Sequence, residues 1–161
     1  MLYLLDANVL ISAHRNYCPI DRRPQFWEWL IREGAAGHAK VPLEIYNEIA
    51  DGNDLLAKWV TEKEVINALV LNEEIDRSIL NRVFEQAYGL NMDDIGLDEA
   101  DRDPFLVAYA LMGGDRCVVT KETSEPLKSR RNRKVPDACN DLGVLCVTDL
   151  QFYRERGFRI E

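Results

Sequence analysis

The sequence predicts an α/β fold of three layers, in which a central, mostly parallel sheet lies between two layers of helices. Two observations support this prediction: short apolar runs typical of buried strands recur along the chain, and segments with helical periodicity separate them. Strands that alternate with helices favour parallel pairing, with helices on both faces of the sheet. The 161 residues are enough for one sizeable core, so we expect a single domain over residues 1–161.

The first half of the chain begins with a strand and continues mainly with helices. Residues 2–5 form an apolar run that predicts a buried strand, with a helix starting directly after it. Residues 24–36 carry aromatic and aliphatic side chains at helical spacing, and Pro42 stands where an N1 proline would start the next helix. A short helix is expected at residues 55–59, and the apolar run 65–71 is interpreted as a strand.

The second half alternates more regularly. A helix is predicted over residues 73–88, where apolar side chains recur every four residues. Asp103 is interpreted as the N-cap of a further helix, because Pro104 follows it at the N1 position. The remaining elements are predicted as a strand, a short helix and a final strand at residues 117–120, 136–142 and 144–148.

Composition narrows the class of protein. The chain is 47% hydrophobic and 30% charged, as in ordinary globular proteins, and it shows neither a signal peptide nor an apolar stretch of membrane-spanning length. Cys117 and Cys146 lie in apolar runs without a C-x-x-C pair, so we expect buried free thiols and a cytoplasmic protein. The net charge of −8 argues against binding nucleic acid by bulk charge, although a local basic strip remains compatible with it.

Asp6 is the most informative residue, because it ends the first apolar run. Ligand sites of open parallel sheets gather at the carboxyl ends of the strands, which is where Asp6 is expected. A carboxylate is costly to bury there without a metal ion or hydrogen-bonding partners. Asp6 is therefore a candidate functional residue, although an aspartate that stabilises a loop by an Asx turn remains the alternative.

Three more acids occupy positions that this topology could bring beside Asp6. Glu48 lies on the helix that follows Pro42, Asp103 at the start of a later helix, and Glu122 just after a predicted strand. Converging carboxylates repel one another, and a hard cation such as Mg²⁺ or Mn²⁺ removes that repulsion. Each acid also has a structural alternative: Glu48 could face solvent and Asp103 could serve only as an N-cap.

Four segments, in the right order, resemble motifs of the PIN-domain nucleases, a family that includes the VapC toxins of bacterial toxin–antitoxin pairs. The first motif is similar to residues 3–11 (YLLDANVLI), and the second-acid stretch to residues 41–48. The third-acid helix looks like residues 103–110 (DPFLVAYA), and the fourth-acid region like residues 118–122 (VVTKE). Residues 134–139 and the Gly-Phe pair at 157–158 resemble a VapC-like branch of the family.

The resemblance implies a PIN fold and metal-dependent cleavage of single-stranded RNA. It implies Mg²⁺ or Mn²⁺ bound by Asp6, Glu48 and Asp103, with Glu122 as a fourth catalytic acid. It further implies an antitoxin or regulatory protein as partner and a possible homodimer. No membrane partner is expected, because no apolar stretch has the length to span a bilayer. Asn8 is expected to hydrogen-bond either Asp6 or a metal-bound water, as groups beside metal ligands do, and Thr120 is expected to serve the acids in the same way.

The chain departs from the family pattern in one acid. Many PIN proteins carry aspartate in the fourth-acid region, where this chain has Glu122 with its longer side chain. Asp98 and Asp101 are close enough to Asp103 in sequence to exchange roles with it, and Asp137 is a further candidate. Which of these acids completes the site stays open at this level.

A dense basic run follows the predicted fourth acid, within the irregular stretch 122–134. Lysine and arginine on a loop can hold RNA phosphates without reading sequence, so we expect this run to bind RNA. A solvated loop that offsets nearby acids is the alternative. The predicted RNA-binding residues are Lys121, Lys128, Arg130, Arg131, Arg133 and Lys134.

Two other functions compete with the nuclease. A haloacid-dehalogenase-like phosphatase also starts with an aspartate at a strand end, but it needs a second aspartate two residues later, where this chain has Asn8. The stronger alternative is a non-catalytic PIN-like module that binds RNA or protein, because Glu122 and the acidic balance leave activity open.

Overall fold

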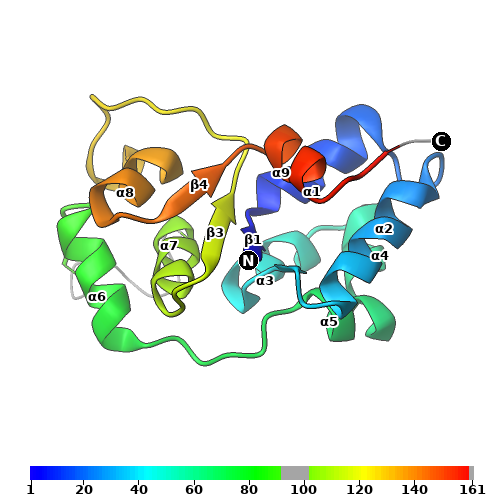
Figure 1. Ribbon diagram of the computed structural model, residues 1–161, viewed down its shortest axis with the longest axis horizontal. Coiled ribbons are helices and arrows are strands. Elements are labelled where there is room, and N and C mark those ends of the chain that lie inside the picture. The colour runs from blue at the N-terminus through cyan, green and yellow to red at the C-terminus, as the bar shows by residue number, and fades with distance from the viewer. Residues whose placement is uncertain (92–101, 160–161) are drawn as a thin grey trace.

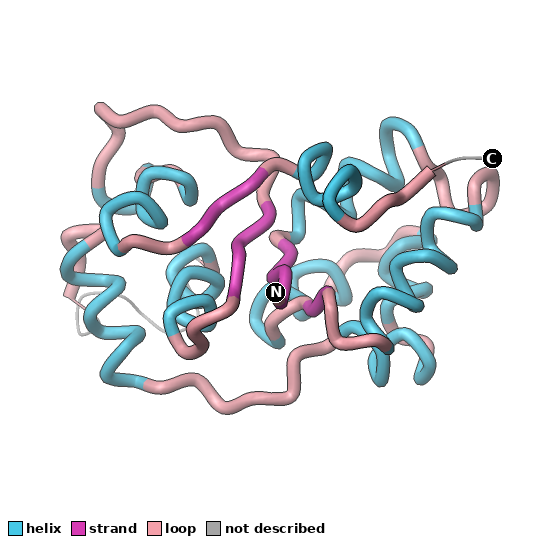
Figure 2. The backbone as a smooth tube through the Cα atoms, viewed as in Figure 1, coloured by secondary structure: helices cyan, strands magenta, loops and turns pink. Residues whose placement is uncertain are grey.

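The computed structural model describes residues 1–91 and 102–159 and shows a three-layer α/β/α arrangement (Figure 1). Within these residues the sheet has four parallel strands in the order β2-β1-β3-β4. Figure 2 shows the strands running side by side through the middle of the molecule. They are β1 (Leu2–Leu5), β2 (Ala39–Lys40), β3 (Arg116–Val119) and β4 (Leu145–Val147).

The helices in the described residues divide between the two faces of the sheet. They are α1 (Ala7–Ser12), α2 (Pro24–Ala35), α3 (Leu43–Ala50), α4 (Leu55–Val60), α5 (Lys63–Leu69), α6 (Arg77–Gln86), α7 (Asp103–Leu111), α8 (Val135–Leu142) and α9 (Asp149–Glu155). A π-helical turn (Ala13–Tyr17) extends α1 without a break.

The alternation of side chains along the strands decides which helix covers which face. Tyr3 of β1 packs its ring 5.0 Å from that of Phe152 in α9, and its register partner in β3 is Cys117. The neighbouring Arg116 donates a hydrogen bond of 2.7 Å to the carbonyl oxygen of Tyr109 in α7. Because successive side chains of a strand point to opposite faces, α9 and α7 lie on different sides of the sheet.

The apolar side chains form one contiguous core, and the aromatic residues concentrate between α2 and α9. Trp27, Trp29 and Trp59 are all buried within it, as their helical spacing indicates. Phe26 of α2 lies edge-on to Tyr153 of α9 at 5.4 Å between ring centroids. Such edge-to-face pairs add roughly 0.5–1.5 kcal/mol to the burial itself. This packing fixes α9 against the sheet beside α2.

One predicted strand is wrong. Residues 63–69 form helix α5, and only the single bridge between Val41 and Val70 joins this region to a strand-like partner. The buried side chains Val65, Ala68 and Leu69 lie three and four positions apart, whereas Ile66 is exposed. That spacing is the helical period. It was not recognised in the sequence because nearly all residues of the run are apolar, so buried and exposed positions look alike.

Three helices begin at other residues, or with other capping residues, than the sequence predicted. Helix α6 begins at Arg77 rather than near Glu73, because Asp76 accepts hydrogen bonds from the backbone of Ser78 and Ile79 as the N-cap. Arg102 occupies the N-cap position of α7, so the prediction that Asp103 caps this helix is wrong; Asp103 is its first residue. Pro42 likewise stands at the N-cap of α3 and not at N1.

Two elements were not anticipated: the two-residue strand β2, and helix α9 at the end of the chain. All four cysteines are free thiols, as expected for Cys117 and Cys146, although Cys146 is half-buried rather than buried. In residues 1–91 and 102–159, no helix is long and apolar enough to cross a membrane.

Candidate functional site

Asp6 lies where the strand order of the sheet reverses. The chain continues from β1 to β2 on one side, and β3 and β4 pair on the other side. In parallel sheets, ligands bind outside the carboxyl ends of the strands at this switch point. The backbone NH of Asp6 donates to the carbonyl oxygen of Val119 at 2.9 Å, so the end of β1 and the end of β3 are held together.

A compact hydrogen-bond network surrounds the Asp6 carboxylate, which is 4% exposed. Thr120 Oγ1 donates to Asp6 Oδ2 at 2.8 Å, and Asn8 Nδ2 donates to the same oxygen at 3.1 Å. The backbone NH of Lys121 donates to Asn8 Oδ1 at 3.1 Å, and that of Glu122 to Thr120 Oγ1 at 3.1 Å. The expected hydrogen bond between Asn8 and Asp6 is thus present. Both side-chain donors use Oδ2, and the backbone NH of Ala7 also donates to the Asp6 carboxylate.

The electrostatics of the site identify its other acids. Burial raises the pKa of Asp6 to about 6; the hydrogen bond from Thr120 opposes this shift, and the charges of Glu122 and Glu48 add to it. Glu122 and Glu48 therefore both lie within electrostatic range of Asp6, although each is more than 40 positions from it in sequence. The charges of Glu122 and Glu48 both favour the protonated form of Asp6.

The four predicted catalytic acids differ in their surroundings. Glu48 is exposed on α3, and Glu122 is half-buried, with Oε2 accepting a hydrogen bond of 2.8 Å from the backbone NH of Val135. Asp103 is half-buried at the start of α7. Its neighbour Arg102 donates to the carbonyl oxygen of Glu44 at 3.3 Å, which places the start of α7 beside α3.

Of the predicted acids, Glu48 and Glu122 lie near enough to Asp6 for their charges to act on it, but they do not form a complete cage. In residues 1–91 and 102–159, no group of three or more carboxylate, imidazole or thiol side chains is close enough to hold a metal ion. Two of the alternative acids, Asp98 and Asp101, lie outside the described residues. Mg²⁺ often uses one or two carboxylates and fills its other positions with water, so the carboxylates around Asp6 fit this cation by their chemistry.

Asp137, another alternative acid, has a structural role on the neighbouring loop. Its carboxylate accepts hydrogen bonds from the Ser124 hydroxyl and, at 2.8 Å, from the backbone NH of Glu125. Burial by itself would raise the pKa of Asp137, but these hydrogen bonds and the charge of Arg133 keep it below its ordinary value. Asp137 therefore fixes the loop that carries Glu122.

Lys121 and Glu122 point to opposite sides of the extended chain that leaves β3. The Glu122 carboxylate reaches the start of α8, whereas Lys121 Nζ forms an ion pair of 3.0 Å with Asp149 at the start of α9. Asp149 is buried and also accepts a hydrogen bond of 2.9 Å from the Tyr17 hydroxyl. An ammonium group thus flanks the acid site on one side and a carboxylate on the other.

Sequence reasoning missed Asp149 and Tyr17. The signal for Asp149 was present, because it comes just after the final strand, as Asp6 comes after the first. Tyr17 carries no comparable signal. It lies in the π-helical turn, a deviation that is frequent at functional sites, and only the folded chain brings it to Asp149.

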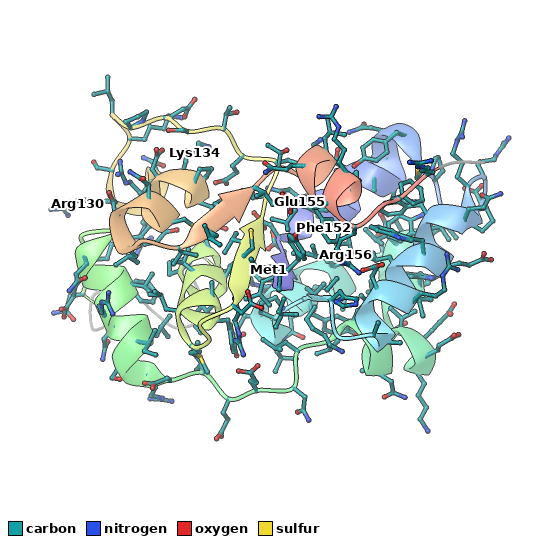
Figure 3. The ribbon with its side chains drawn as sticks, viewed as in Figure 1. Met1, Arg130, Lys134, Phe152, Glu155 and Arg156 are labelled. Carbon is teal, nitrogen blue, oxygen red and sulfur yellow. The ribbon has the colours of Figure 1, made fainter. Side chains whose placement is uncertain are left out.

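The predicted basic run spreads along the loop from β3 to α8, and Lys121 is its one member that contacts the network around Asp6 in the described residues. Lys128 pairs with Glu125 at 2.9 Å, and Arg133 pairs with Asp141 at 2.9 Å. Figure 3 shows Lys134 above α8 and Arg130 at the far left edge, beyond α6 and α8. Arg130 and Arg131 are both exposed.

Residues 3–160 match the model of a protein family that is described as a domain of unknown function (DUF4411). The chain belongs to this family. No curated protein matches the sequence. Because the description of the family names no activity, the function has to be inferred from the site itself.

The Thr120 hydroxyl is the one neutral group that both lowers the pKa of Asp6 and holds the backbone of Glu122. Replacing it in Thr120→Val should raise the pKa of Asp6 further above its ordinary value, because a donor to the charged form is lost. We also expect a loss of about 1–3 kcal/mol in the free energy of unfolding at pH 7. NMR titration of the Asp6 carboxyl carbon and urea unfolding measure the two effects.

Thr123→Val is the matched control, because Thr123 is exposed on the same loop. It should leave both quantities unchanged. An unaltered titration of Asp6 in Thr120→Val would contradict the role assigned to this hydroxyl.

Proposed function

We propose that this chain is a PIN-type, metal-dependent endoribonuclease that hydrolyses single-stranded RNA. The observation that supports this most strongly is the Asp6 carboxylate, buried at the switch point of the sheet, with a pKa raised by burial and by Glu122 and Glu48. A buried acid whose pKa is strongly shifted and that lies at a ligand-binding edge is a candidate functional residue. The order of the four motifs that resemble PIN nucleases adds independent support.

Asp6, Glu48 and Asp103 would hold Mg²⁺ or Mn²⁺, directly or through water, and Glu122 would assist at a second position. All four offer the hard oxygen atoms that these cations prefer. When bound, such a cation lowers the pKa of a water molecule and neutralises charge on the phosphoryl oxygens. The raised pKa of Asp6 fits this assignment, because a cation is the partner that would restore its charged form.

The residues around Asp6 have roles in this proposal that follow from their contacts. Thr120 and Asn8 orient the carboxylate by donating to Oδ2. Glu122, whose Oε2 accepts the backbone NH of Val135, is held in a position to orient the attacking water. Lys121, paired with the buried Asp149, would contact a phosphate beside the one that is cut.

The proposal extends to a toxin that an antitoxin restrains, and this part derives from the resemblance to VapC proteins alone. The exposed cations Arg130 and Arg131 would attract either RNA or an acidic partner segment. A neighbouring open reading frame that encodes a small antitoxin or DNA-binding regulator would support it.

The non-catalytic PIN-like module remains the alternative, and one observation favours it. In the described parts of the chain, no three ligand-type side chains are close enough to hold a metal ion. If the chain binds RNA or protein without cutting, the acids around Asp6 need not collect a cation.

Titration of the purified protein with Mn²⁺ separates these two functions. Isothermal titration of the wild-type protein should show binding that is lost in the double variant Asp6→Asn/Asp103→Asn. The wild-type protein should also cut a 5′-labelled unstructured RNA with Mn²⁺, and EDTA should stop the reaction. Asp21→Asn is the control, because Asp21 is 56% exposed on a surface turn. Equal binding heats for wild type and double variant would overturn the proposal in favour of the non-catalytic module.

A further inference from the structure

A hollow of about 220 Å³ lies directly beside the acid site. It is bounded by the loop that follows β3, the carboxyl end of β4, and the first turns of α8 and α9. In Figure 1 this loop runs along the top of the molecule, above β4 and α8. Thr120 and Glu122 belong both to the network around Asp6 and to the wall of the hollow. A ligand that occupies the hollow would therefore lie next to a ligand group that is bound over Asp6.

The wall of the hollow is fixed before any ligand binds. Glu122 is held by the backbone NH of Val135, and Ser124 and Glu125 are held by the buried carboxylate of Asp137. These contacts tie the loop after β3 to the first turn of α8 on both sides of Thr123. Sites that are formed in advance bind with a smaller loss of entropy than sites that must order.

The lining of the hollow suits a neutral, flat group. Pro136, Cys146 and Val147 provide apolar surface, and the exposed side chains of Thr148 and Gln151 complete the polar part of the lining. Gln151 Nε2 donates to Glu155 Oε1 at 3.1 Å, and Thr148 Oγ1 accepts the backbone NH of Gln151 at 3.2 Å. The Gln151 amide oxygen, as an acceptor, and the Thr148 hydroxyl proton, as a donor, are therefore the polar groups of these two residues that a ligand would use. Among the described residues that line it there is no lysine or arginine, and Glu122 contributes a negative charge. A phosphate would meet no cation there, whereas a base would find apolar contact together with a donor and an acceptor.

The size of the hollow agrees with this chemistry. Pockets that enclose drug-sized ligands span roughly 300–1,000 Å³, so about 220 Å³ admits a smaller group such as one ring system. Proteins that recognise single-stranded RNA commonly splay bases out, pack them against side chains and hydrogen-bond their edges.

We propose that this hollow is a subsite for one unpaired nucleobase of the RNA strand, next to the phosphate that lies over Asp6. Gln151 is the residue that sets which base the subsite accepts, because its amide oxygen can accept from a base edge while its Nε2 donates to Glu155 Oε1 at 3.1 Å. The inference rests on the proposed nuclease function. It adds to that function a preference for the base on one side of the cleaved phosphodiester bond. The catalytic acids by themselves would not provide such a preference.

The test introduces a large side chain at position 151, which lines the hollow, and compares its effect with that of the same side chain at the adjacent position 150 of α9. Gln151→Trp places a large side chain at the hollow, and Leu150→Trp places the same side chain on a residue that is 59% exposed and does not line it. Both changes are made in an Asp6→Asn background, so that binding is measured without cleavage. The probes are four fluorescent single-stranded homopolymers, rA₆, rC₆, rG₆ and rU₆, followed by anisotropy.

Protein with Asp6→Asn alone should bind one homopolymer about tenfold more tightly than the weakest of the four. Leu150→Trp should keep this discrimination and Gln151→Trp should abolish it. Gln151→Leu, which keeps the size of the side chain but removes the amide, should also lose discrimination; it serves if the tryptophan variant fails to fold. The same pattern of discrimination in all variants, or none in Asp6→Asn alone, overturns the subsite.

Cleavage distinguishes failure of the subsite from failure of the nuclease proposal. With Asp6 restored, wild type and Leu150→Trp should cut a mixed-sequence RNA at the same positions in Mn²⁺, and Gln151→Trp should cut without that base preference. Cutting with an unchanged pattern in Gln151→Trp rejects the subsite while the nuclease proposal stands. Binding with discrimination but without cutting rejects the nuclease and retains the base-binding hollow.

Discussion

Asp6→Asn is expected to lower metal-dependent RNA cleavage at least ~100-fold, because even groups that only orient metal ligands contribute 10–100-fold to affinity or activity. Asparagine keeps an oxygen that can accept from Thr120, which now donates to Asp6 Oδ2 at 2.8 Å. The local hydrogen bonding and the fold should therefore survive, and only the charge is lost. The measurement is the rate of cleavage of a labelled, unstructured RNA in Mn²⁺ under single-turnover conditions.

Asp21→Asn, prepared in parallel, controls for a contaminating ribonuclease and for the general effect of removing one negative charge. Asp21 is 56% exposed and pairs only loosely with Arg22, at 3.7 Å. It should cleave at the wild-type rate. If Asp6→Asn retains wild-type cleavage, then Asp6 is not a metal ligand and the proposed site is wrong.

The second large effect is on stability, and it has the opposite sign. In the metal-free protein at pH 7, Asp6→Asn should be more stable to unfolding than wild type by about 3 kcal/mol. Burial raises the pKa of Asp6 from 3.8 to about 6 in the folded protein, and each pKa unit corresponds to about 1.36 kcal/mol. Since Asp6 is 4% exposed, little of this effect is screened by solvent.

The direction with pH follows from proton binding. The folded state holds the Asp6 proton more tightly than the unfolded state, so the contribution to stability is fully present below about pH 4 and is lost as pH rises through about 6. Asparagine has no such proton, so the difference in unfolding free energy between the two proteins should grow across this window. Urea unfolding in EDTA between pH 4 and pH 7.5 measures it.

Addition of Mn²⁺ gives the complementary result. A ligand that binds only the folded state stabilises it, so Mn²⁺ at neutral pH should restore stability to wild type and leave Asp6→Asn unchanged. Parallel pH curves for the two proteins in EDTA would show that Asp6 is not the buried, protonated acid described above.

Local sequence patterns were sufficient for much of the fold. Residues 2–5, 24–36 and 136–142 were predicted within one residue of β1, α2 and α8, because apolar period, proline and glycine act over a few positions. The run 65–71 was assigned wrongly because an apolar stretch of seven residues fits a buried strand as well as a helix. The short strand β2 has too few residues to show any period.

Some residues of the candidate site could likewise be predicted from the sequence, and others could not. Asp6, Asn8, Thr120 and Glu122 were chosen from the ends of two predicted strands, and they converge because β1 and β3 are parallel neighbours in the sheet. Asp149 carries the same signal after β4, but its pairing with Lys121 depends on α9 folding back beside the first strand. Tyr17 reaches Asp149 only through the π-helical turn.

The sequence by itself determined the class of the fold, the edge of the sheet at which Asp6 lies, and the acids to be compared with it. These depend on period and on strand ends, which are local properties of the chain. The tertiary structure decided which charges act on Asp6, that Asp137 holds a loop, and that Lys121 pairs with a buried carboxylate. Those outcomes depend on burial and on distances between residues far apart in the chain, and neither exists before the core between α2, α9 and the sheet has formed.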